Sequence, residues 1–225
     1  MALPDNSRLT IHSRTRLSRE FYDRDPRRVS PDLLGKVLVR KQGRRFRTAR
    51  IVEVEAYLGE HDPAAHSFAG RTPRNAVLFG PPGFAYVYFI YGNHYCLNVS
   101  CMPDGVAGGI LFRALEPLSG IEEMAHSRNL SIHSTRDLLK LTRGPGRLAE
   151  AFDITRERDN GKDLTSGRSD LVVADDGYRV RRILTTPRIG ITKASELTLR
   201  YLIAGNEFVS GTKIRNQPSG GEFEG

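Results

Sequence analysis

The sequence predicts a single α+β domain built around a mixed, mainly antiparallel β-sheet. Segments with strand-like alternation predominate, and helical segments do not alternate with them one for one, as they would in a parallel α/β fold. The chain has 225 residues, of which 39% are hydrophobic and 27% charged, a balance typical of a globular protein with a buried core. We expect one domain at 17–212, between a flexible N-terminal arm (1–16) and a flexible C-terminal tail (213–225).

Prolines and glycines divide the first half of the chain into elements. Residues 19–36 predict two short helices broken at Pro26 and Pro31. Strands are expected at 36–41 and 47–57, a long loop at 59–75, and two strands within 81–101 that turn at Gly92 and Asn93. The second half predicts a strand at 108–115, a helix that Pro117 opens and that continues to 129, helices at 135–141 and 146–154, and strands at 170–175, 178–184 and 196–205.

Charge and cysteine usage narrow the class of protein. Lysine plus arginine number 34 against 26 acids, a net charge of +8, and 28 of the 34 are arginine. Because guanidinium groups bind phosphate bidentately, this excess favours a polyanionic partner, with codon usage as the plain alternative. Cys96 and Cys101 would point to opposite faces of one strand, which predicts reduced thiols and an intracellular protein. No apolar run approaches the ~20 residues that span a bilayer, and the N-terminus lacks a secretory pattern, so no membrane association is expected.

The strand at 51–57 places acids beside a phenol. Side chains alternate along a strand, so Glu53, Glu55 and Tyr57 share one face, which is either a solvated surface or the wall of a cleft. His61, Asp62 and His66 follow in a proline-containing loop, and their spacing does not match a helical zinc motif. The sequence has no serine in a nucleophile-elbow motif and no lysine near the tyrosines, so it does not indicate a covalent nucleophile. A carboxylate that activates water remains as the catalytic candidate.

Two further segments carry candidate ligand-binding groups. Tyr86 and Tyr88 share a strand face, and Tyr91 lies next to the hairpin turn, where it either pairs with Tyr95 or enters a DNA minor groove as a wedge. Arg113 is the single cation of an apolar strand, either paired with a carboxylate such as Glu116 or clamping a phosphate. The segment at 142–152 places Arg143 and Arg147 at the mouth of a helix as weak phosphate-binding candidates, with no match to a nucleotide-binding loop.

Together these segments resemble the alkyladenine (3-methyladenine) DNA glycosylase family. The resemblance runs from LLGKVLVR to EFVSG and is densest in RIVEVEAYLGEHDPAAHS, RTPRN, PGFAYVYFIYGNHYCLNVS and LFRALEP. It implies a compact domain around a curved, largely antiparallel sheet that resembles an open barrel, with short flanking helices and a protruding β-hairpin. The implied enzyme is a monofunctional hydrolase of base excision repair that flips alkylated, deaminated or etheno purines out of double-stranded DNA. It would cut the N-glycosidic bond with an activated water and leave an abasic site, without metal or other cofactor.

The resemblance also implies roles for single residues. Glu55 is expected to activate the water, while Arg113 holds the phosphate of the flipped nucleotide and helps to fix that water. The remaining roles are stacking on the base by Tyr57 and Tyr88, reading of the purine edge by His66, rejection of the guanine 2-amino group by Asn98, and intercalation by Tyr91. Asn93 stands where the family has an apolar residue, and the acid for neutral leaving bases is left unassigned.

Other function classes stay open. A non-catalytic module that binds damaged DNA would use the same wedge and cationic face but would not need Glu55. An RNA-directed N-glycosidase is the third alternative, because phosphate contacts do not distinguish the two sugars. For the leading interpretation we expect a monomer in the cytoplasm, at the nucleoid in a bacterium and in the nucleus in a eukaryote.

Overall fold

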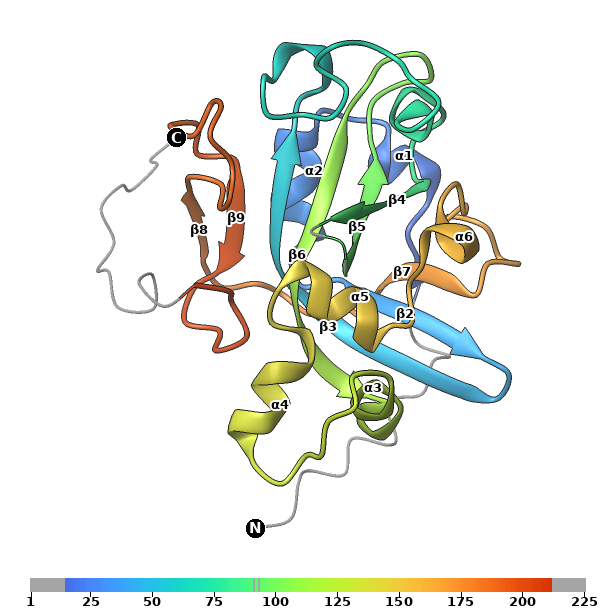
Figure 1. Ribbon diagram of the computed structural model, residues 1–225, viewed down its shortest axis with the longest axis vertical. Helices are drawn as coiled ribbons and strands as arrows, with labels where there is room; N and C mark the ends of the chain where they lie inside the picture. The colour runs from blue at the N-terminus through green and yellow to red at the C-terminus, as the bar shows by residue number, and fades with distance from the viewer. Residues whose placement is uncertain (1–14, 91, 93, 212–225) are drawn as a thin grey trace.

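The computed structural model describes residues 15–90, 92 and 94–211. Its described strands form one nine-stranded sheet in which every pairing is antiparallel, with the order β1-β7-β2-β3-β6-β5-β4, β9 beside β3 and β8 beside β9. The strands are β1 (Thr15–Arg16), β2 (Val37–Gln42), β3 (Arg45–Tyr57), β4 (Ala85–Ile90), β5 (His94–Ser100), β6 (Gly109–Ser119), β7 (Leu171–Asp175), β8 (Ile183–Thr186) and β9 (Arg200–Ile203). The predicted fold class is confirmed: this is one compact α+β domain around a curled, open-barrel-like sheet (Figure 1).

The long strand β3 gives the sheet its curl. Its first part pairs with β2, and beyond residue 52 the same edge pairs with β9, while β6 runs along the other edge. Register shifts between β3 and β6 fall at Thr48/Ala49 and around Glu53. Because a β-bulge bends a strand and increases its twist, these irregularities turn the second half of β3 away from the first.

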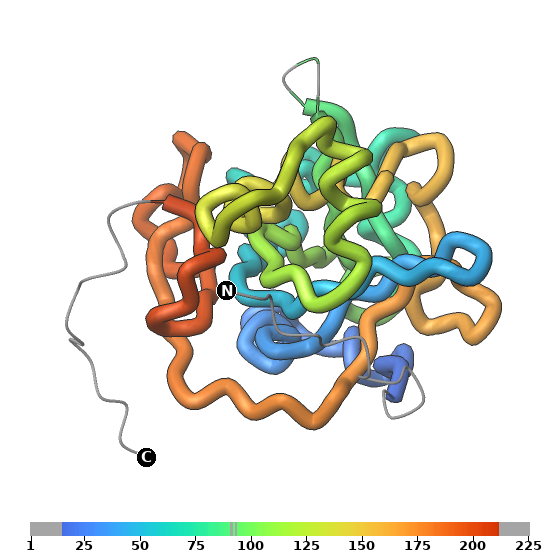
Figure 2. The backbone as a smooth tube through the Cα atoms, turned by 90° about the horizontal axis from the view of Figure 1, so that it is seen from below, coloured from blue at the N-terminus to red at the C-terminus, as the bar shows by residue number. Residues whose placement is uncertain are grey.

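Short helices cover both sides of the sheet. They are α1 (Arg19–Tyr22), α2 (Pro26–Leu33), α3 (Ile121–Ser127), α4 (Thr135–Thr142), α5 (Pro145–Ala151) and α6 (Arg156–Asp159), with 3₁₀ turns η2 (Gly59–His61) and η3 (Ala76–Phe79) in the long loop. Figure 2 shows α2 and α5 on opposite sides of the sheet. In α2, Asp25 caps the helix by accepting from the Arg27 amide, Pro26 occupies the first turn, and Val29 and Leu33 are buried in the core.

Two predictions that rested on proline are wrong. Pro31 does not break the helix, since α2 continues through it to Leu33. Pro117 does not open a helix: it lies in β6, opposite Ala49 and next to a register shift, and α3 begins only after Gly120. Proline is tolerated in a strand at such an irregularity, where the ladder hydrogen bond is already disturbed.

The predicted strands near the C-terminus are shorter in the structure. Residues 178–184 contribute only the start of β8, and residues 196–205 contribute only β9. Helix α6 was not predicted from the sequence. At the predicted hairpin turn, Gly92 has a φ of 73°, the left-handed conformation that glycine adopts without strain. Asn93 lies outside the described residues.

Both cysteines are free and buried, as predicted. Of the predicted arm, Thr15 and Arg16 pair with β7, and residues 1–14 lie outside the described residues, as does the predicted tail. Within the described chain, no helix has both the length and the apolar character needed to cross a membrane.

Candidate active site

The predicted shared face of β3 is confirmed as a buried wall and not as a solvated surface. The Tyr57 hydroxyl donates a hydrogen bond to Glu55 Oε2 over 3.0 Å, and Arg113 from the neighbouring strand β6 contacts Glu53 and Glu55 together. Both carboxylates are fully buried. Burying two acids requires compensating donors and cations, and the structure supplies them from distant parts of the chain.

Glu53 is saturated with donors. Its Oε1 accepts from Arg113 Nε at 3.0 Å, from Arg200 Nε at 2.6 Å and from the Ser210 hydroxyl at 2.8 Å, while its Oε2 accepts from the Ser210 amide at 2.6 Å. Four donors leave this carboxylate no role in moving a proton. Glu53 therefore fixes Arg113 and the C-terminal segment in place.

Glu55 has a different environment. Besides the Tyr57 hydroxyl, it accepts from the Ile189 amide at 2.8 Å and lies 3.1 Å from Arg113 Nη1. Burial opposes charge on Arg113, but Glu55 and Glu53 outweigh it and raise the pKa of the guanidinium. The predicted alternative in which Arg113 pairs with a carboxylate is confirmed, but its partners are Glu53 and Glu55 and not Glu116, which accepts from Asn206.

A cavity of about 480 Å³ opens beside this cluster. Tyr57 and Arg113 line it from β3 and β6, and the predicted base-binding residues His66, Tyr88 and Asn98 line it as well. Its remaining lining comes from the loop after β3, the hairpin strands β4 and β5, the start of α5 and residues 189–191. The structure thus brings Tyr57, His66, Tyr88, Asn98 and Arg113 to one cavity, next to Glu55.

Aromatic and polar contacts order the cavity wall. The rings of His66 and Tyr88 meet edge to face with centroids 4.4 Å apart, and His66 Nδ1 lies 3.0 Å from the Tyr86 hydroxyl. Asn98 donates from Nδ2 to the Tyr86 carbonyl, which fixes the amide. Burial raises the pKa of Tyr88, and burial together with the Glu55 charge raises the pKa of Tyr57, so both phenols stay neutral. The pKa of His66 is lowered because part of its ring is withdrawn from water, with Arg74 adding to the effect.

The two arginines predicted near α5 have separate positions. Arg143 donates to the carbonyls of Val209 at 2.8 Å and Gly211 at 3.1 Å, so it ties the C-terminal segment to the fold, and it does not line the cavity. Arg147 is exposed and lines the cavity at the α5 end.

The predicted wedge residue, Tyr91, lies outside the described residues, so both interpretations of it stay predictions. In the hairpin as described, the residue opposite Tyr95 is Phe89, whose ring centroid is 5.0 Å away.

Arg188 is a residue of this region that was not predicted from the sequence. This fully buried side chain forms a bidentate ion pair with Asp62 and places its guanidinium 4.6 Å from the centre of the Tyr57 ring. Its neighbour Ile189 supplies the amide that binds Glu55. As one arginine among 28 in a segment without a motif, Arg188 gave no signal in the sequence.

Of the three residues weighed as metal ligands, Asp62 is occupied by Arg188, His66 lines the cavity and His61 is exposed away from it. Across residues 15–90, 92 and 94–211, no cluster of three histidine, cysteine or acidic side chains could hold a metal ion.

Comparisons with known proteins show the family of this chain. A model of the family described as methylpurine-DNA glycosylase (MPG) matches residues 20–207. A relative from Koribacter versatilis (strain Ellin345) is 62% identical over 197 residues, covering 88% of this chain and 94% of its own. Relatives from Burkholderia lata and Alkaliphilus oremlandii are 48% identical over 200 residues and 44% over 202, covering 88% and 87% of this chain and 93% and 98% of theirs. All three bear the name "Putative 3-methyladenine DNA glycosylase". Residues 20–207 include every residue that lines the cavity.

Proposed function

The chain belongs to the methylpurine-DNA glycosylase family, and from this premise we propose that it removes damaged purines from double-stranded DNA by the water-activation chemistry of Glu55. The protein is a DNA glycosylase, a hydrolase that acts on N-glycosyl bonds in base excision repair. Which damaged bases it removes, and how, forms the proposal.

In the proposed reaction, a damaged nucleotide leaves the duplex and its base enters the cavity. Glu55 takes a proton from a water molecule while the water oxygen bonds to the sugar C1′ and the C1′–N bond to the purine breaks. The departing purine keeps the electron pair of that bond, and an abasic site remains. The Glu55 carboxylate also stabilises the positive charge that develops on the sugar. Arg113, at the cavity wall and 3.1 Å from Glu55, holds the phosphate of the flipped nucleotide and orients the water.

The phenols give the cavity its preference for damaged purines. Tyr57 and Tyr88 stack on the two faces of the base, and Tyr91 fills the gap that the base leaves in the duplex. An alkylated purine is cationic, which strengthens its stacking on electron-rich rings and improves it as a leaving group. His66 reads the purine edge, and the buried Asn98 excludes the 2-amino group of normal guanine. Hypoxanthine and ethenoadenine are neutral and need a proton on leaving; no residue is assigned to supply it.

One observation carries the proposal: a fully buried carboxylate, Glu55, lies beside a cavity whose lining includes the phenols of Tyr57 and Tyr88 and the guanidinium of Arg113. The test is incubation of the protein with duplexes that contain hypoxanthine, ethenoadenine or 7-methylguanine, followed by alkaline cleavage at abasic sites. We expect strand breaks at the lesion, undiminished in excess chelator because the proposed chemistry uses no metal.

The other function classes predict different results in the same assay. Lesion binding without strand breaks would support the non-catalytic binding module. Release of bases from RNA but not from duplex DNA would support the RNA-directed enzyme. We further propose that the protein acts as a monomer in the cytoplasm or at the nucleoid, which sedimentation and fractionation would test.

A further inference from the structure

The cavity has a second end that the chemistry above does not use. There it is lined by His94 and Ile90, next to the turn of the β4–β5 hairpin, and by residues 144–147 at the start of α5. His94 and Ile90 form the last described pair of that hairpin. A group bound here would therefore lie between the hairpin and α5.

His94 is held in one orientation by a carboxylate. Its Nδ1 lies 2.8 Å from Oε1 of Glu150 on α5, and the other oxygen of Glu150 lies 3.4 Å from Arg128. An imidazole whose Nδ1 donates to a carboxylate has Nε2 left for another partner, and Nε2 becomes a donor when the ring is protonated. Among the described residues, Nε2 has no hydrogen-bond partner.

Close packing also fixes the ring. Gly146 lies directly against it: a β-carbon at Gly146 would stand 2.8 Å from Cγ and 3.0 Å from Cβ of His94. Such distances are not compatible with any side chain, so glycine is required for this approach. The hydrogen bond to Glu150 and the contact with Gly146 together preorganise the imidazole at the cavity wall.

The charges at this end favour an anion. Arg147, the residue after Gly146, is exposed and lines the same part of the cavity. Glu150 is the nearby acid, and its charge is already shared by His94 and Arg128. When His94 is protonated, these four groups carry a net positive charge of two, with Arg147 and His94 at the cavity.

We propose that protonated His94 and Arg147 form a binding site for a backbone phosphodiester of the lesion-bearing DNA, adjacent to the flipped nucleotide. The site rests on the proposed function, since it needs the hairpin to enter DNA beside the cavity. Phosphate is the anionic group that DNA presents at regular intervals along each strand, and donors that bind it fix the register of a protein on the duplex. The titratable and charged groups around His94 are Glu150 and Arg147 on α5 and Arg128 after α3. Because Nδ1 is engaged with Glu150, Nε2 donates to a phosphate only when the ring is protonated, so the contact strengthens as the pH falls.

The test pairs the protein with DNA in which single phosphates have lost their charge. A lesion duplex with a 2′-fluoro sugar at the damaged nucleotide, which slows cleavage, is made with one neutral methylphosphonate at each linkage near the lesion in turn. At about pH 6, we expect wild-type affinity to fall by about tenfold at one linkage, as for a lost hydrogen bond to a charged group. His94→Gln should bind the all-phosphate duplex more weakly and show no further loss at that linkage. The matched control His126→Gln, an exposed histidine of α3 outside the cavity, should behave like the wild type.

Two results would overturn the site. One is a His94→Gln variant whose affinity still falls at the same linkage by the wild-type factor. The other is a variant whose affinity is lowered by the same factor for every duplex in the series, which would assign His94 to a base or sugar. If His94→Gln does not fold, the wild type still decides: its loss at that linkage must be larger at about pH 6 than at about pH 8.5, and equal losses exclude histidine. Excision of the unmodified lesion by the wild type is scored separately, so failure of the glycosylase proposal would be distinguished from failure of the phosphate site.

Discussion

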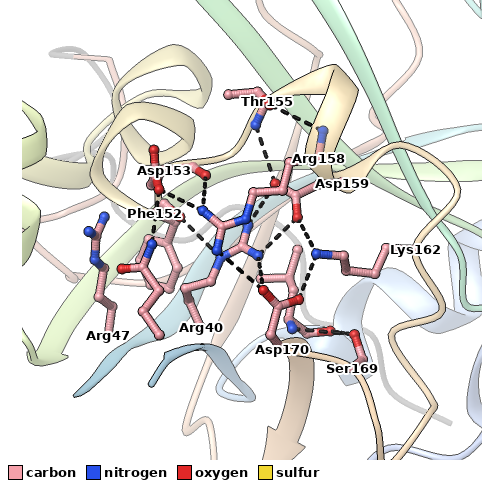
Figure 3. Close-up of polar contacts among 12 residues, drawn as sticks. Arg40, Arg47, Phe152, Asp153, Thr155, Arg158, Asp159, Lys162, Ser169 and Asp170 are labelled. Atoms are coloured by element: carbon pink, nitrogen blue, oxygen red, sulfur yellow. Dashed lines mark hydrogen bonds and ion pairs between the residues drawn. The ribbon is translucent and has the colours of Figure 1, made fainter. Parts of the chain in front are cut away.

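Two of the clusters in which buried arginines pair with carboxylates differ in their position relative to the cavity: the Arg113 cluster adjoins it and the Arg40 cluster does not. The Arg40 cluster comprises Arg40, Asp153, Arg158, Asp159, Lys162 and Asp170 and joins β2, α6 and the start of β7 (Figure 3). The Arg113 cluster comprises Glu53, Glu55, Arg113, Arg200 and Ser210 and joins β3, β6, β9 and the C-terminal segment. Each contains as many cations as acids.

The clusters differ in what surrounds them. Arg40 and Asp159 are both fully buried and bind each other through two hydrogen bonds of 2.7 and 2.9 Å, with none of the cluster lining the cavity. The loop that this cluster anchors pairs with the outer edge of β4, where Ala85 exchanges hydrogen bonds with Gly161 and Lys162. In the Arg113 cluster, Arg113 lines the cavity and Glu55 binds the cavity residue Tyr57. Burial of an ion pair is therefore common to both clusters, and contact with the cavity is what distinguishes the Arg113 cluster as part of the candidate site.

The largest expected effect is that of Glu55→Gln in the Arg113 cluster. Removing a general base lowers the rate by about 10²- to 10⁴-fold, and we expect single-turnover base release to fall within that range. Glu53 remains to balance Arg113, so the fold and lesion binding should persist. Gel-shift affinity and excision rate are measured on the same preparation, with the exposed Glu60→Gln as the matched control. Excision at the wild-type rate would remove Glu55 from the mechanism.

Arg40→Met tests the other half of the comparison. Breaking a buried ion pair by removing one partner costs about 3–5 kcal/mol, so the free energy of unfolding in urea should fall by that amount. The excision rate per folded molecule should stay within about twofold of the wild type, because the cluster does not line the cavity. Arg45→Ala, which removes an exposed and long ion pair with Glu123, should change stability by less than about 1 kcal/mol. A large loss of rate with Arg40→Met would show that the Arg40 cluster also serves the site.

Features of the fold and of the site that depend on neighbouring residues could be predicted from the sequence. Alternation along 51–57 was sufficient to place Glu53, Glu55 and Tyr57 on one face, because the period of a strand is a local property. The local rule that proline ends an element gave wrong predictions at Pro31 and Pro117, where tertiary packing tolerates it.

The long-range part could not be predicted from the sequence. Ile189 lies 134 positions from Glu55, and Arg200 lies 147 positions from Glu53. No periodicity relates such residues. Their contacts arise because β3 curls, so that its second half pairs with β9. For the same reason, nothing in the sequence separated Arg188 from the arginines that cover the surface, whereas Arg113 stood out as the single cation of an apolar strand.

Tyr57→Phe isolates one hydrogen bond at the edge of the Arg113 cluster. The ring that would stack on the base is kept, and Glu55 loses the 3.0 Å donor. A hydrogen bond to a charged group contributes about 1.5–3 kcal/mol, so the excision rate should fall by about 10- to 100-fold with little change in lesion affinity. An equal loss in affinity would assign the hydroxyl to base binding instead.

The raised pKa of the Tyr57 hydroxyl leads to a prediction for the excision rate at alkaline pH. Burial and the Glu55 charge raise the pKa of Tyr57, so the phenol stays a donor while a free tyrosine would ionise near pH 10. In the wild type, the excision rate should therefore not decline between about pH 8 and about pH 9.5. A decline in that range that disappears in Tyr57→Phe would contradict the raised pKa. The unfolded chain ionises first at high pH, so this residue contributes stability below about pH 10 and loses it above.

The smallest effects are expected from removing one serine hydroxyl in each region. Ser210→Ala removes the 2.8 Å hydrogen bond to Glu53 and a 3.4 Å contact with Arg113, while the Ser210 amide still binds Glu53 and its carbonyl still accepts from Arg200. Ser169→Ala removes a 2.7 Å hydrogen bond to the Leu171 carbonyl beside the Arg40 cluster (Figure 3). Each hydroxyl contributes about 0.5–1.5 kcal/mol to stability, so the two variants should unfold at similar urea concentrations.

Their excision rates should nevertheless differ. Arg113 gains freedom only in Ser210→Ala, which we expect to slow single-turnover excision by about two- to fivefold, whereas Ser169→Ala should match the wild type. If the two variants slow excision equally, loss of rate follows from loss of stability alone, and the distinction between a scaffold cluster and a site cluster fails. If only Ser210→Ala is slower, the hydroxyl acts through the position of Arg113, because it neither lines the cavity nor touches Glu55.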